Sequence, residues 1–373
     1  MSFLKSGAKE RELVLKRILC IISSLDAGGA ETFLMKVCRT LSPEEYRFDF
    51  IVSVGGGCYT QEVLGRGSHI YQIPLRTKSP LRALSGIQRI VRENNYSIVL
   101  KLGEDALAGL DLAAAKLGGA RILALRSCNA PTGDSFVRRS AHRLFRPLLN
   151  SVSTLKLAPS DLAAEYMFGK GKQVHLLHNG VDLRVFHYDQ AGRSRIREEL
   201  SLESKLVMGH VGRFTRQKNH SYLLEVFAQL RAIREDAALL LVGTGELESA
   251  VRERVRELGL EDAVIFAGQR FDIPQLLSAM DVFVFPSFHE GMPNTVIEAQ
   301  ATGLPCIIAD TITREADITG LVQYLSLKQP AAFWAEKALA SLTDQRVDTA
   351  QAFLEQGYDI ESVATELLRL LGS

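Results

Sequence analysis

The stretch Asp281–Asp310, DVFVFPSFHEGMPNTVIEAQATGLPCIIAD, contains the unit from which we predict the fold. It opens with a short apolar run, passes through a turn with Gly and Pro, continues as a helical pattern and ends in a second apolar run. Buried strand, turn, helix and buried strand in this order are typical of a parallel sheet. The stretch therefore predicts an α/β protein.

The same order of strand, Gly-containing turn and helix recurs along the chain. Its first series includes the apolar runs RILCIISSL, FDFIVSV, IVLKL and RILALRS, and its second includes LVMGHVGRF, ALLLVGTGE and AVIFAG. A polar, turn-rich stretch over 181–204 separates the two series and is the predicted interdomain linker. We therefore predict two domains with parallel sheets over 17–180 and 205–345, and a last apolar helix within 346–373 that could pack on either.

Composition limits the classes of function. The 373 residues are 46% hydrophobic and 23% charged with a net charge of +1, which is typical of a soluble globular protein and gives no reason to expect nucleic-acid binding. No apolar run of about 18 residues predicts a membrane-spanning helix, and the charged N-terminus does not resemble a signal peptide. The five scattered cysteines indicate reduced thiols in the cytoplasm and no zinc site.

Two cations follow a predicted strand in GRFTRQKNH, Gly212–His220. Parallel sheets bind ligands beyond the carboxyl ends of their strands, so two such domains should face a shared cleft. Arg213 and Lys218 lie at such an end, just before a helix, where a bidentate guanidinium and a point charge suit a diphosphate. The alternative is an ordinary surface pair of cations.

Two glutamates flank the turn that opens the helix of the decisive stretch. The amides of Gly291, Met292, Asn294 and Thr295 at a helix start suit phosphate, whereas carboxylates on either side would repel it. A ligand with hydroxyl groups on both sides of its phosphates resolves the conflict, because carboxylates accept hydrogen bonds from vicinal hydroxyls. A nucleotide sugar is such a ligand, with one ring for Glu290 and the other for Glu298.

Two further turns are weaker candidates. Gly28 and Gly29 in DAGGAE permit close approach of backbone amides to an anion, although a plain strand-to-helix turn would use them equally well. Backbone groups near Arg270 in FAGQRFD could read the edge of a base. Neither turn identifies a ligand on its own.

The segment 136–149 alternates basic and apolar residues at helical spacing. A helix with this pattern suits a membrane surface that carries anionic headgroups. A solvated helix face and a site for an anionic acceptor are the alternatives.

Taken together, GGAE, NGVD, GHVGRFTRQKNH, LLLVGTGELE and AMDVFVFPSFHEGMPNTVIEAQATGLPC resemble the family 4 glycosyltransferases of GT-B fold, and most closely the bacterial capsular and exopolysaccharide enzymes. The resemblance runs from about residue 17 to the end. It implies two Rossmann-like domains facing an interdomain cleft, a C-terminal helix that crosses back to the first domain, transfer with retention of configuration, and no metal or other cofactor.

The resemblance also implies roles for individual residues. Arg213 and Lys218 would bind the donor diphosphate and act in catalysis with Glu290, which would contact the transferred sugar, and Glu298 would bind the ribose. The amides near 291–295 would complete the phosphate site. The remaining predicted positions are Gly28 and Gly29 opposite the donor, Arg270 by the base, and Glu31, Arg126 and Asn129 on the acceptor side.

The first domain departs from the family pattern. Related sequences carry histidines in a segment after a strand, where this chain reads LRSCNAP with Arg126 and Cys128. This departure concerns the acceptor side and any step that needs a neutral imidazole, and it leaves the donor side untouched. Arg126 could take a phosphate-bearing or otherwise anionic acceptor.

We therefore predict a hexosyltransferase (EC 2.4) that uses a nucleoside-diphosphate sugar, with UDP as the expected nucleotide, in the cytoplasm or at the inner face of the plasma membrane. The expected acceptor is a lipid-linked saccharide in polysaccharide or glycolipid assembly. The alternatives are transfer to a small-molecule aglycone, a sugar-nucleotide epimerase, and a non-catalytic nucleotide-sugar-binding partner.

Overall fold

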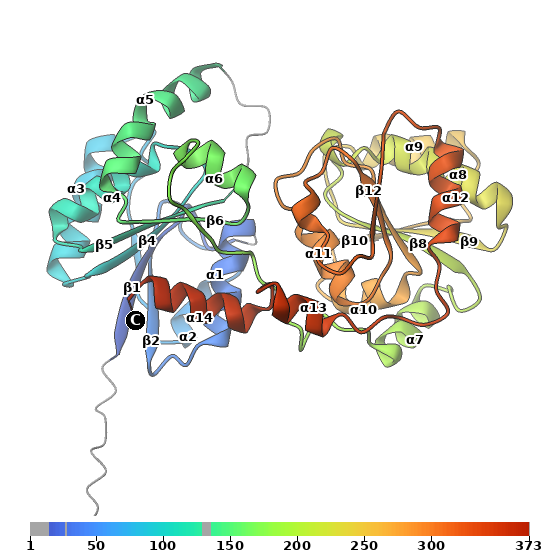
Figure 1. Cartoon of the computed structure of the whole chain (residues 1–373), viewed down its shortest axis with the longest axis horizontal. Coiled ribbons are helices and arrows are strands. Elements are labelled where there is room, and N and C mark those ends of the chain that lie inside the picture. The colour runs from blue at the N-terminus through green and yellow to red at the C-terminus, as the bar shows by residue number, and fades with distance from the viewer. Residues whose placement is uncertain (1–14, 27, 129–135, 373) are drawn as a thin grey trace, which may run out of the picture.

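The computed structural model describes residues 15–26, 28–128 and 136–372 as two α/β lobes (Figure 1). A seven-stranded parallel sheet in the order β3-β2-β1-β4-β5-β6-β7 forms the centre of the first lobe. A six-stranded parallel sheet in the order β10-β9-β8-β11-β12-β13 forms the centre of the second. Each order reverses direction once, between β1 and β4 and between β8 and β11, which confirms the predicted α/β class.

The strands of the first lobe are β1 (Lys16–Ile21), β2 (Tyr46–Val52), β3 (Ile70–Gln72), β4 (Ile98–Gly103), β5 (Ile122–Ser127), β6 (Leu155–Ala158) and β7 (His175–Leu176). Its helices are α1 (Gly29–Thr40), α2 (Thr60–Gly65), α3 (Pro80–Glu93), α4 (Ala108–Gly118), α5 (Phe136–Val152) and α6 (Asp161–Phe168).

The second lobe contains β8 (Leu206–Val211), β9 (Ala237–Val242), β10 (Val264–Gly268), β11 (Val282–Phe285), β12 (Cys306–Ala309) and β13 (Val322–Leu325). Its helices are α7 (Gln190–Glu199), α8 (His220–Ile233), α9 (Glu248–Glu257), α10 (Ile273–Ala279), α11 (Asn294–Ala301) and α12 (Ala331–Ala340), with short 3-10 turns at Arg216–Lys218 and Arg314–Ala316.

Burial on both faces explains the continuous apolar runs of the central strands. In β1, Ile18 and Cys20 pack in a core with α1, whereas Leu19 and Ile21 pack on the opposite face with α3 and α4. Successive side chains of a strand point to opposite faces, so a strand covered by helices on both sides needs apolar residues throughout.

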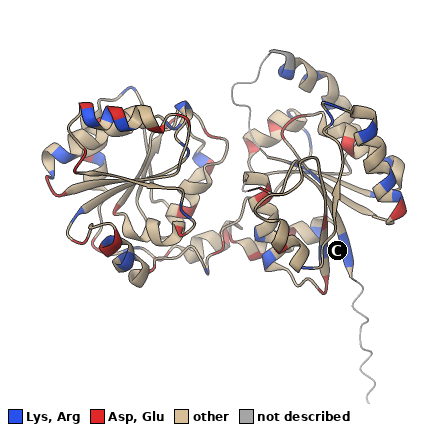
Figure 2. Ribbon diagram, turned by 180° about the vertical axis from the view of Figure 1, so that it is seen from behind, with Lys and Arg blue, Asp and Glu red and all other residues tan. Residues whose placement is uncertain are grey.

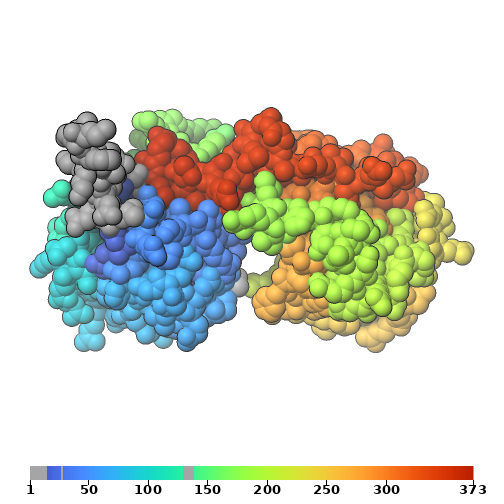
Figure 3. Space-filling model, turned by 90° about the horizontal axis from the view of Figure 1, so that it is seen from below, coloured from blue at the N-terminus to red at the C-terminus, as the bar shows by residue number. Residues whose placement is uncertain are grey.

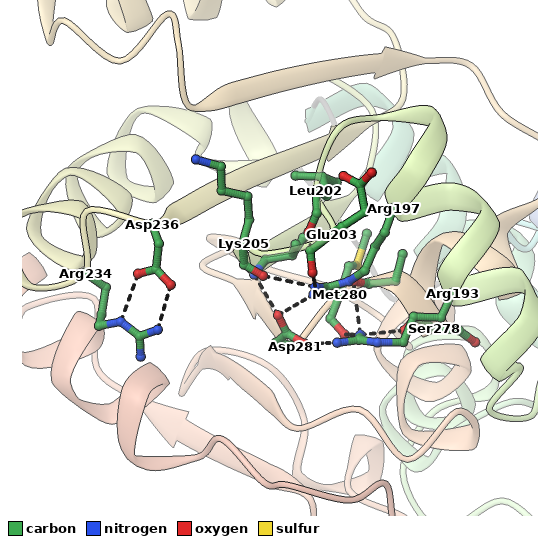
Figure 4. A network of polar contacts seen from close by, with 12 residues as sticks. Arg193, Arg197, Leu202, Glu203, Lys205, Arg234, Asp236, Ser278, Met280 and Asp281 are labelled. Atoms are coloured by element: carbon green, nitrogen blue, oxygen red, sulfur yellow. Dashed lines mark hydrogen bonds and ion pairs between the residues drawn. The ribbon is translucent and has the colours of Figure 1, made fainter.

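The predicted linker contains a helix that is fixed to the second lobe. Arg193 and Arg197 of α7 donate to the two carboxylate oxygens of Asp281 at 2.7 and 2.6 Å (Figure 4). Both arginines also donate to carbonyl groups at the end of α10, including that of Ala279 at 3.2 and 3.0 Å. A helix end leaves such carbonyls without partners, and the guanidinium groups supply them. The second half of the predicted linker is therefore part of the second lobe.

The C-terminal segment predicted as one helix forms two, α13 (Ala350–Glu355) and α14 (Ile360–Leu370). Leu367 of α14 is fully buried in the same core as Ile18 of β1, while Phe353 of α13 packs with Ile297 of α11. In Figures 1 and 3 this last segment runs across both lobes. The chain thus crosses between the lobes twice.

Charges of both signs lie on both lobes (Figure 2). This distribution agrees with the net charge of +1 and shows no lobe of one sign.

Candidate active site

A cavity of about 200 Å³ lies between the lobes, beyond the carboxyl ends of their strands. The first lobe lines it with Gly28, Gly29 and Glu31 at the start of α1, and the second lobe with Met292 and Asn294 at the start of α11. Both helices therefore point their N-terminal ends, where amide groups lack intrahelical acceptors, at one space. Residues predicted from two distant motifs are thus brought together.

Lys218 and Glu290 form an ion pair between the loops that follow β8 and β11 of the second lobe. The Nζ atom of Lys218 lies 2.8 Å from Oε1 of Glu290, and the two side chains are 17% and 10% exposed. The ammonium also lies over the ring of Phe285, 4.4 Å from its centroid. Water and salt screen the attraction between two such shielded charges less than they screen a pair on the surface.

Three hydrogen bonds hold the loops that carry this pair. Gln217 donates through Nε2 to the carbonyl of His289 at 2.8 Å, and its own carbonyl accepts from the amide of Phe288 at 2.9 Å. Asn219, in the left-handed conformation with φ 55°, donates to the carbonyl of Pro286 at 3.1 Å. The loop after β8 and the loop after β11 thus form one unit.

Arg213 follows the end of β8 directly and is exposed. Within the described ranges no ion pair or hydrogen bond engages its guanidinium, so it can turn toward an anion. Gly291 and Thr295 are half-buried in the turn and the first turn of α11. Their roles on the donor side stay predictions.

Glu298 lies on α11, close to the position that the sequence predicts. The helix begins at Asn294, so Glu298 is its fifth residue and lies one full turn in, on the same face as Asn294. Its Oε1 accepts a hydrogen bond from Nζ of Lys36 on α1 at 3.2 Å. The Gly291–Pro293 segment stays outside the helix, so Glu298 lies where the first turn of α11 passes into the second.

Glu31 folds back over the start of α1. Its Oε2 lies close to Gly28, so a Cβ atom at that position would require the Glu31 side chain to shift. Burial raises the pKa of Glu31, and the nearby Glu104 and Asp26 carboxylates add to the effect. A polar acceptor would meet this carboxyl group in the cavity wall.

Arg126 lies in the cavity wall but is only 1% exposed. Its Nη2 donates to the carbonyl of Leu177 at 3.0 Å and to Oδ1 of Asn179 at 2.6 Å, and its guanidinium stacks 3.7 Å from the centroid of Phe33. Burial lowers its pKa to about 10. The group therefore holds the crossing between the lobes, and an acceptor role stays a prediction. Asn129 lies outside the described residues.

Arg270 is not part of the cavity wall. It donates to Glu199 at the end of α7 at 2.6 Å and to Asp272 at 2.8 and 2.7 Å. Two carboxylates thus hold its side chain, and the structure provides no support for a contact with a base.

Four residues near the cavity were not predicted from the sequence. Ser23, Glu104, Cys128 and Asn179 line it as well. Glu104 and Cys128 each follow the end of a strand, β4 and β5, so the rule that located Arg213 would also have found them. Asn179 comes from the crossing between the lobes, for which no periodic pattern exists.

Two histidines lie directly behind the loop of Lys218. The His220 ring stacks 4.4 Å from Phe214 and is 3% exposed, and His210 is fully buried with Nδ1 2.9 Å from the carbonyl of Val284. Burial, together with the charge of Lys218, lowers the pKa of His220 to about 4. Both rings are therefore neutral in the folded protein at neutral pH.

This burial predicts a loss of stability in acid. Above about pH 6.5 the imidazole of His220 is neutral in both states; below it, the unfolded chain binds a proton that the folded chain refuses down to about pH 4. The free energy of unfolding should thus fall by about 3 kcal/mol over this range through His220 alone. Urea titrations across it should show a shallower pH dependence for His220→Phe, and an unchanged one for the exposed His187→Gln. Equal slopes in all three proteins would contradict the assignment.

No helix among the described residues is both long and apolar enough to span a bilayer. In the same part of the chain, no three His, Cys, Asp or Glu side chains cluster in a way that could hold a metal ion.

Two family descriptions match this chain: Glycosyltransferase Family 4 over residues 27–185 and Glycosyl transferases group 1 over residues 205–344. The sequence is 33% identical over 368 residues to "Putative glycosyltransferase EpsF" of Bacillus subtilis (strain 168), covering 95% of this chain and 96% of the relative. Over 155 residues, 40% of each protein, it is 33% identical to the UDP-Gal:alpha-D-GlcNAc-diphosphoundecaprenol alpha-1,3-galactosyltransferase of Escherichia coli.

Among solved structures, Anabaena HepE in complex with UDP-glucose matches with a TM-score of 0.77 at 20% identity, covering 95% of this chain and 99% of that one. The two parallel sheets and the family matches over both lobes lead to the same assignment. The chain belongs to the family 4 glycosyltransferases, sugar-transferring enzymes of GT-B fold.

Proposed function

We propose that this glycosyltransferase moves a sugar from a UDP-sugar to an acceptor hydroxyl with retention of the anomeric configuration. The observation that carries the proposal is the ion pair of Lys218 with Glu290, 2.8 Å apart on the loops that follow the carboxyl ends of β8 and β11. UDP is supported by the names of the Escherichia coli relative and of the HepE complex. Retention is what the family resemblance implies.

In the proposed reaction the bond between the anomeric carbon and the diphosphate oxygen breaks, the acceptor hydroxyl oxygen forms a bond to the same carbon, and the hydroxyl proton leaves with the UDP. Negative charge grows on the leaving UDP, where Lys218, Arg213 and the amides at the start of α11 stabilise it. Glu290 lies toward the transferred sugar and opposes the positive charge that develops on its ring. Glu298, one turn further into α11, binds the ribose hydroxyl groups.

For the acceptor we propose a lipid-linked saccharide in polysaccharide or glycolipid assembly. The Escherichia coli relative carries a diphosphoundecaprenol acceptor in its name. Such an acceptor sits at a membrane, so we place the enzyme in the cytoplasm at the inner face of the plasma membrane.

Helix α5 supports this location. Arg139 and Arg143 are exposed on it, and Leu144 beside them is 74% exposed. No ion pair in the described part of the chain engages either arginine. Exposed cations next to an exposed apolar side chain suit anionic headgroups over an acyl layer.

Replacing Arg139 and Arg143 with Ala should weaken binding to phosphatidylglycerol-containing vesicles. Each surface cation contributes about 1 kcal/mol to such binding, so the double variant should lose about 30-fold in partitioning. Cosedimentation with these vesicles and with pure phosphatidylcholine measures the effect. Arg254→Ala/Arg256→Ala on α9 is the matched control, and equal losses in both variants would contradict a role for α5.

The transfer itself is tested by a screen of nucleoside-diphosphate sugars with the purified enzyme. We expect UDP release that depends on an added lipid-linked saccharide, with the α-anomeric product given by an α-linked donor. UDP release that is fastest with small aglycones would favour transfer in secondary metabolism. Binding of no nucleotide sugar from the panel would overturn the proposal.

A further inference from the structure

Two side-chain contacts join the first lobe and the crossing segment to α11. Nζ of Lys36, in the third turn of α1, donates to Oε1 of Glu298 and to the carbonyl of Gly180, at 3.2 Å in both cases. Asn179 donates through Nδ2 to Oδ1 of Asn294 at 2.7 Å. Asn294 and Glu298 lie one turn apart on one face of α11, so both contacts hold the same face.

The contact of Lys36 is shielded from solvent. The side chains of Lys36 and Glu298 are 14% and 15% exposed, and the ammonium lies 5.8 Å from the ring centroid of Phe186. A hydrogen bond between charged groups is stronger in such surroundings than between the same groups on an exposed surface. It also fixes two groups 262 positions apart in the chain, one from each lobe.

One oxygen of the Glu298 carboxylate remains for a ligand. Lys36 donates to Oε1, and no residue in the described ranges donates a hydrogen bond to Oε2. A carboxylate accepts several hydrogen bonds, so the free oxygen can receive a hydroxyl group while the other stays bonded to the ammonium. The contact with Lys36 therefore orients Oε2 of Glu298 before the ligand binds, which is how a supporting group improves a binding site.

We propose that Lys36 is a positioning residue for the donor site, which holds the Glu298 carboxylate toward the ribose. The inference rests on the proposed function, because it takes the ribose of a UDP-sugar as the ligand of Glu298. In this arrangement α1 serves the donor twice, through amides at its start and through Lys36 two turns later.

The test compares UDP binding and kinetics for Lys36→Met, Lys36→Arg and Glu298→Gln. Lys36→Met should raise the Kd for UDP and the donor KM by about tenfold, the scale found when a group that orients a ligand-binding residue is removed. The kcat at saturating donor should change by less than about threefold, since the reacting atoms lie elsewhere. Lys36→Arg, which keeps the charge, should recover most of the affinity.

A double-mutant cycle separates positioning from general stabilisation. Glu298→Gln should weaken UDP binding, and adding Lys36→Met to it should change the Kd by less than about twofold, because the group to be positioned is gone. Additive losses would overturn the inference. The matched control is Arg39→Met, one turn further along α1, whose bidentate pair with Glu62 stays within the first lobe.

The outcomes also separate the inference from the proposed function. Hydrogen exchange in the ligand-free protein should show faster exchange of the α11 amides in Lys36→Met and not in Arg39→Met. If the wild type binds UDP and Lys36→Met binds it equally tightly, the inference alone is overturned. A wild type that binds no UDP would overturn the proposed function, and the inference with it.

Discussion

Lys218→Ala is expected to lower kcat by about 10²–10³, because a preorganised cation aimed at charge on the leaving group is lost. Its ammonium is held by the carboxylate of Glu290 at 2.8 Å and lies over the ring of Phe285, so its position is fixed before the donor binds. Initial rates at saturating UDP-sugar measure the effect. The donor KM should rise as well, since Lys218 also binds the diphosphate in the ground state.

The variant needs a stability control, because Glu290 is left 10% exposed without its counter-charge. Breaking a shielded pair from one side can cost up to about 3–5 kcal/mol of stability. Lys218→Arg keeps the charge and should retain the fold, with a rate between those of the wild type and the alanine variant. Lys328→Ala, an exposed lysine of the same lobe, should change neither rate nor melting temperature. Wild-type rates for a folded Lys218→Ala protein would remove Lys218 from the mechanism.

Glu290→Gln is expected to lower turnover by about 10² while leaving donor binding intact. The carboxylate opposes positive charge that exists mainly in the transition state, so its loss affects kcat rather than affinity. In the free enzyme Lys218 loses its partner, and its ammonium becomes fully available to the diphosphate. The Kd for UDP should therefore stay the same or fall by a few-fold.

Isothermal titration with UDP and single-turnover kinetics with UDP-sugar separate the two effects. A rise in Kd without a change in the single-turnover rate would assign Glu290 to ground-state binding instead. Combining Glu290→Gln with Lys218→Ala should cost less than the sum of the two, because each group orients the other.

The sequence predicted the chemistry at strand ends because that chemistry is local. In a parallel sheet the loop after a strand lies at the carboxyl edge, which is why Gly28 could be assigned to the cavity from its neighbours in the chain and why Lys218 and Glu290 are predicted there. The same rule would have found Glu104, which was omitted although it follows β4 directly. The boundaries were less certain: α11 begins at Asn294, after the Gly291–Pro293 segment.

Partners of long side chains could not be predicted in this way. Arg270 is bonded to Glu199, 71 positions away, and Arg126 turns its guanidinium to the carbonyl of Leu177. Periodicity indicates which face of an element is buried, whereas the hydrogen-bond partner depends on which other element packs there. The helix α7 illustrates the same limit, since its polar sequence suggests a linker and its arginines fix it to Asp281.

By itself, then, the sequence determined the two parallel sheets, the cleft that they face and the residues that their strand ends deliver to it, because alternating burial and turn chemistry are properties of short segments. Only the tertiary structure decided that Lys36 meets Glu298, that Arg126 is buried and that α14 returns to the first lobe. These contacts join segments distant in sequence, and their formation depends on the complementary packing of whole surfaces, which no local pattern encodes.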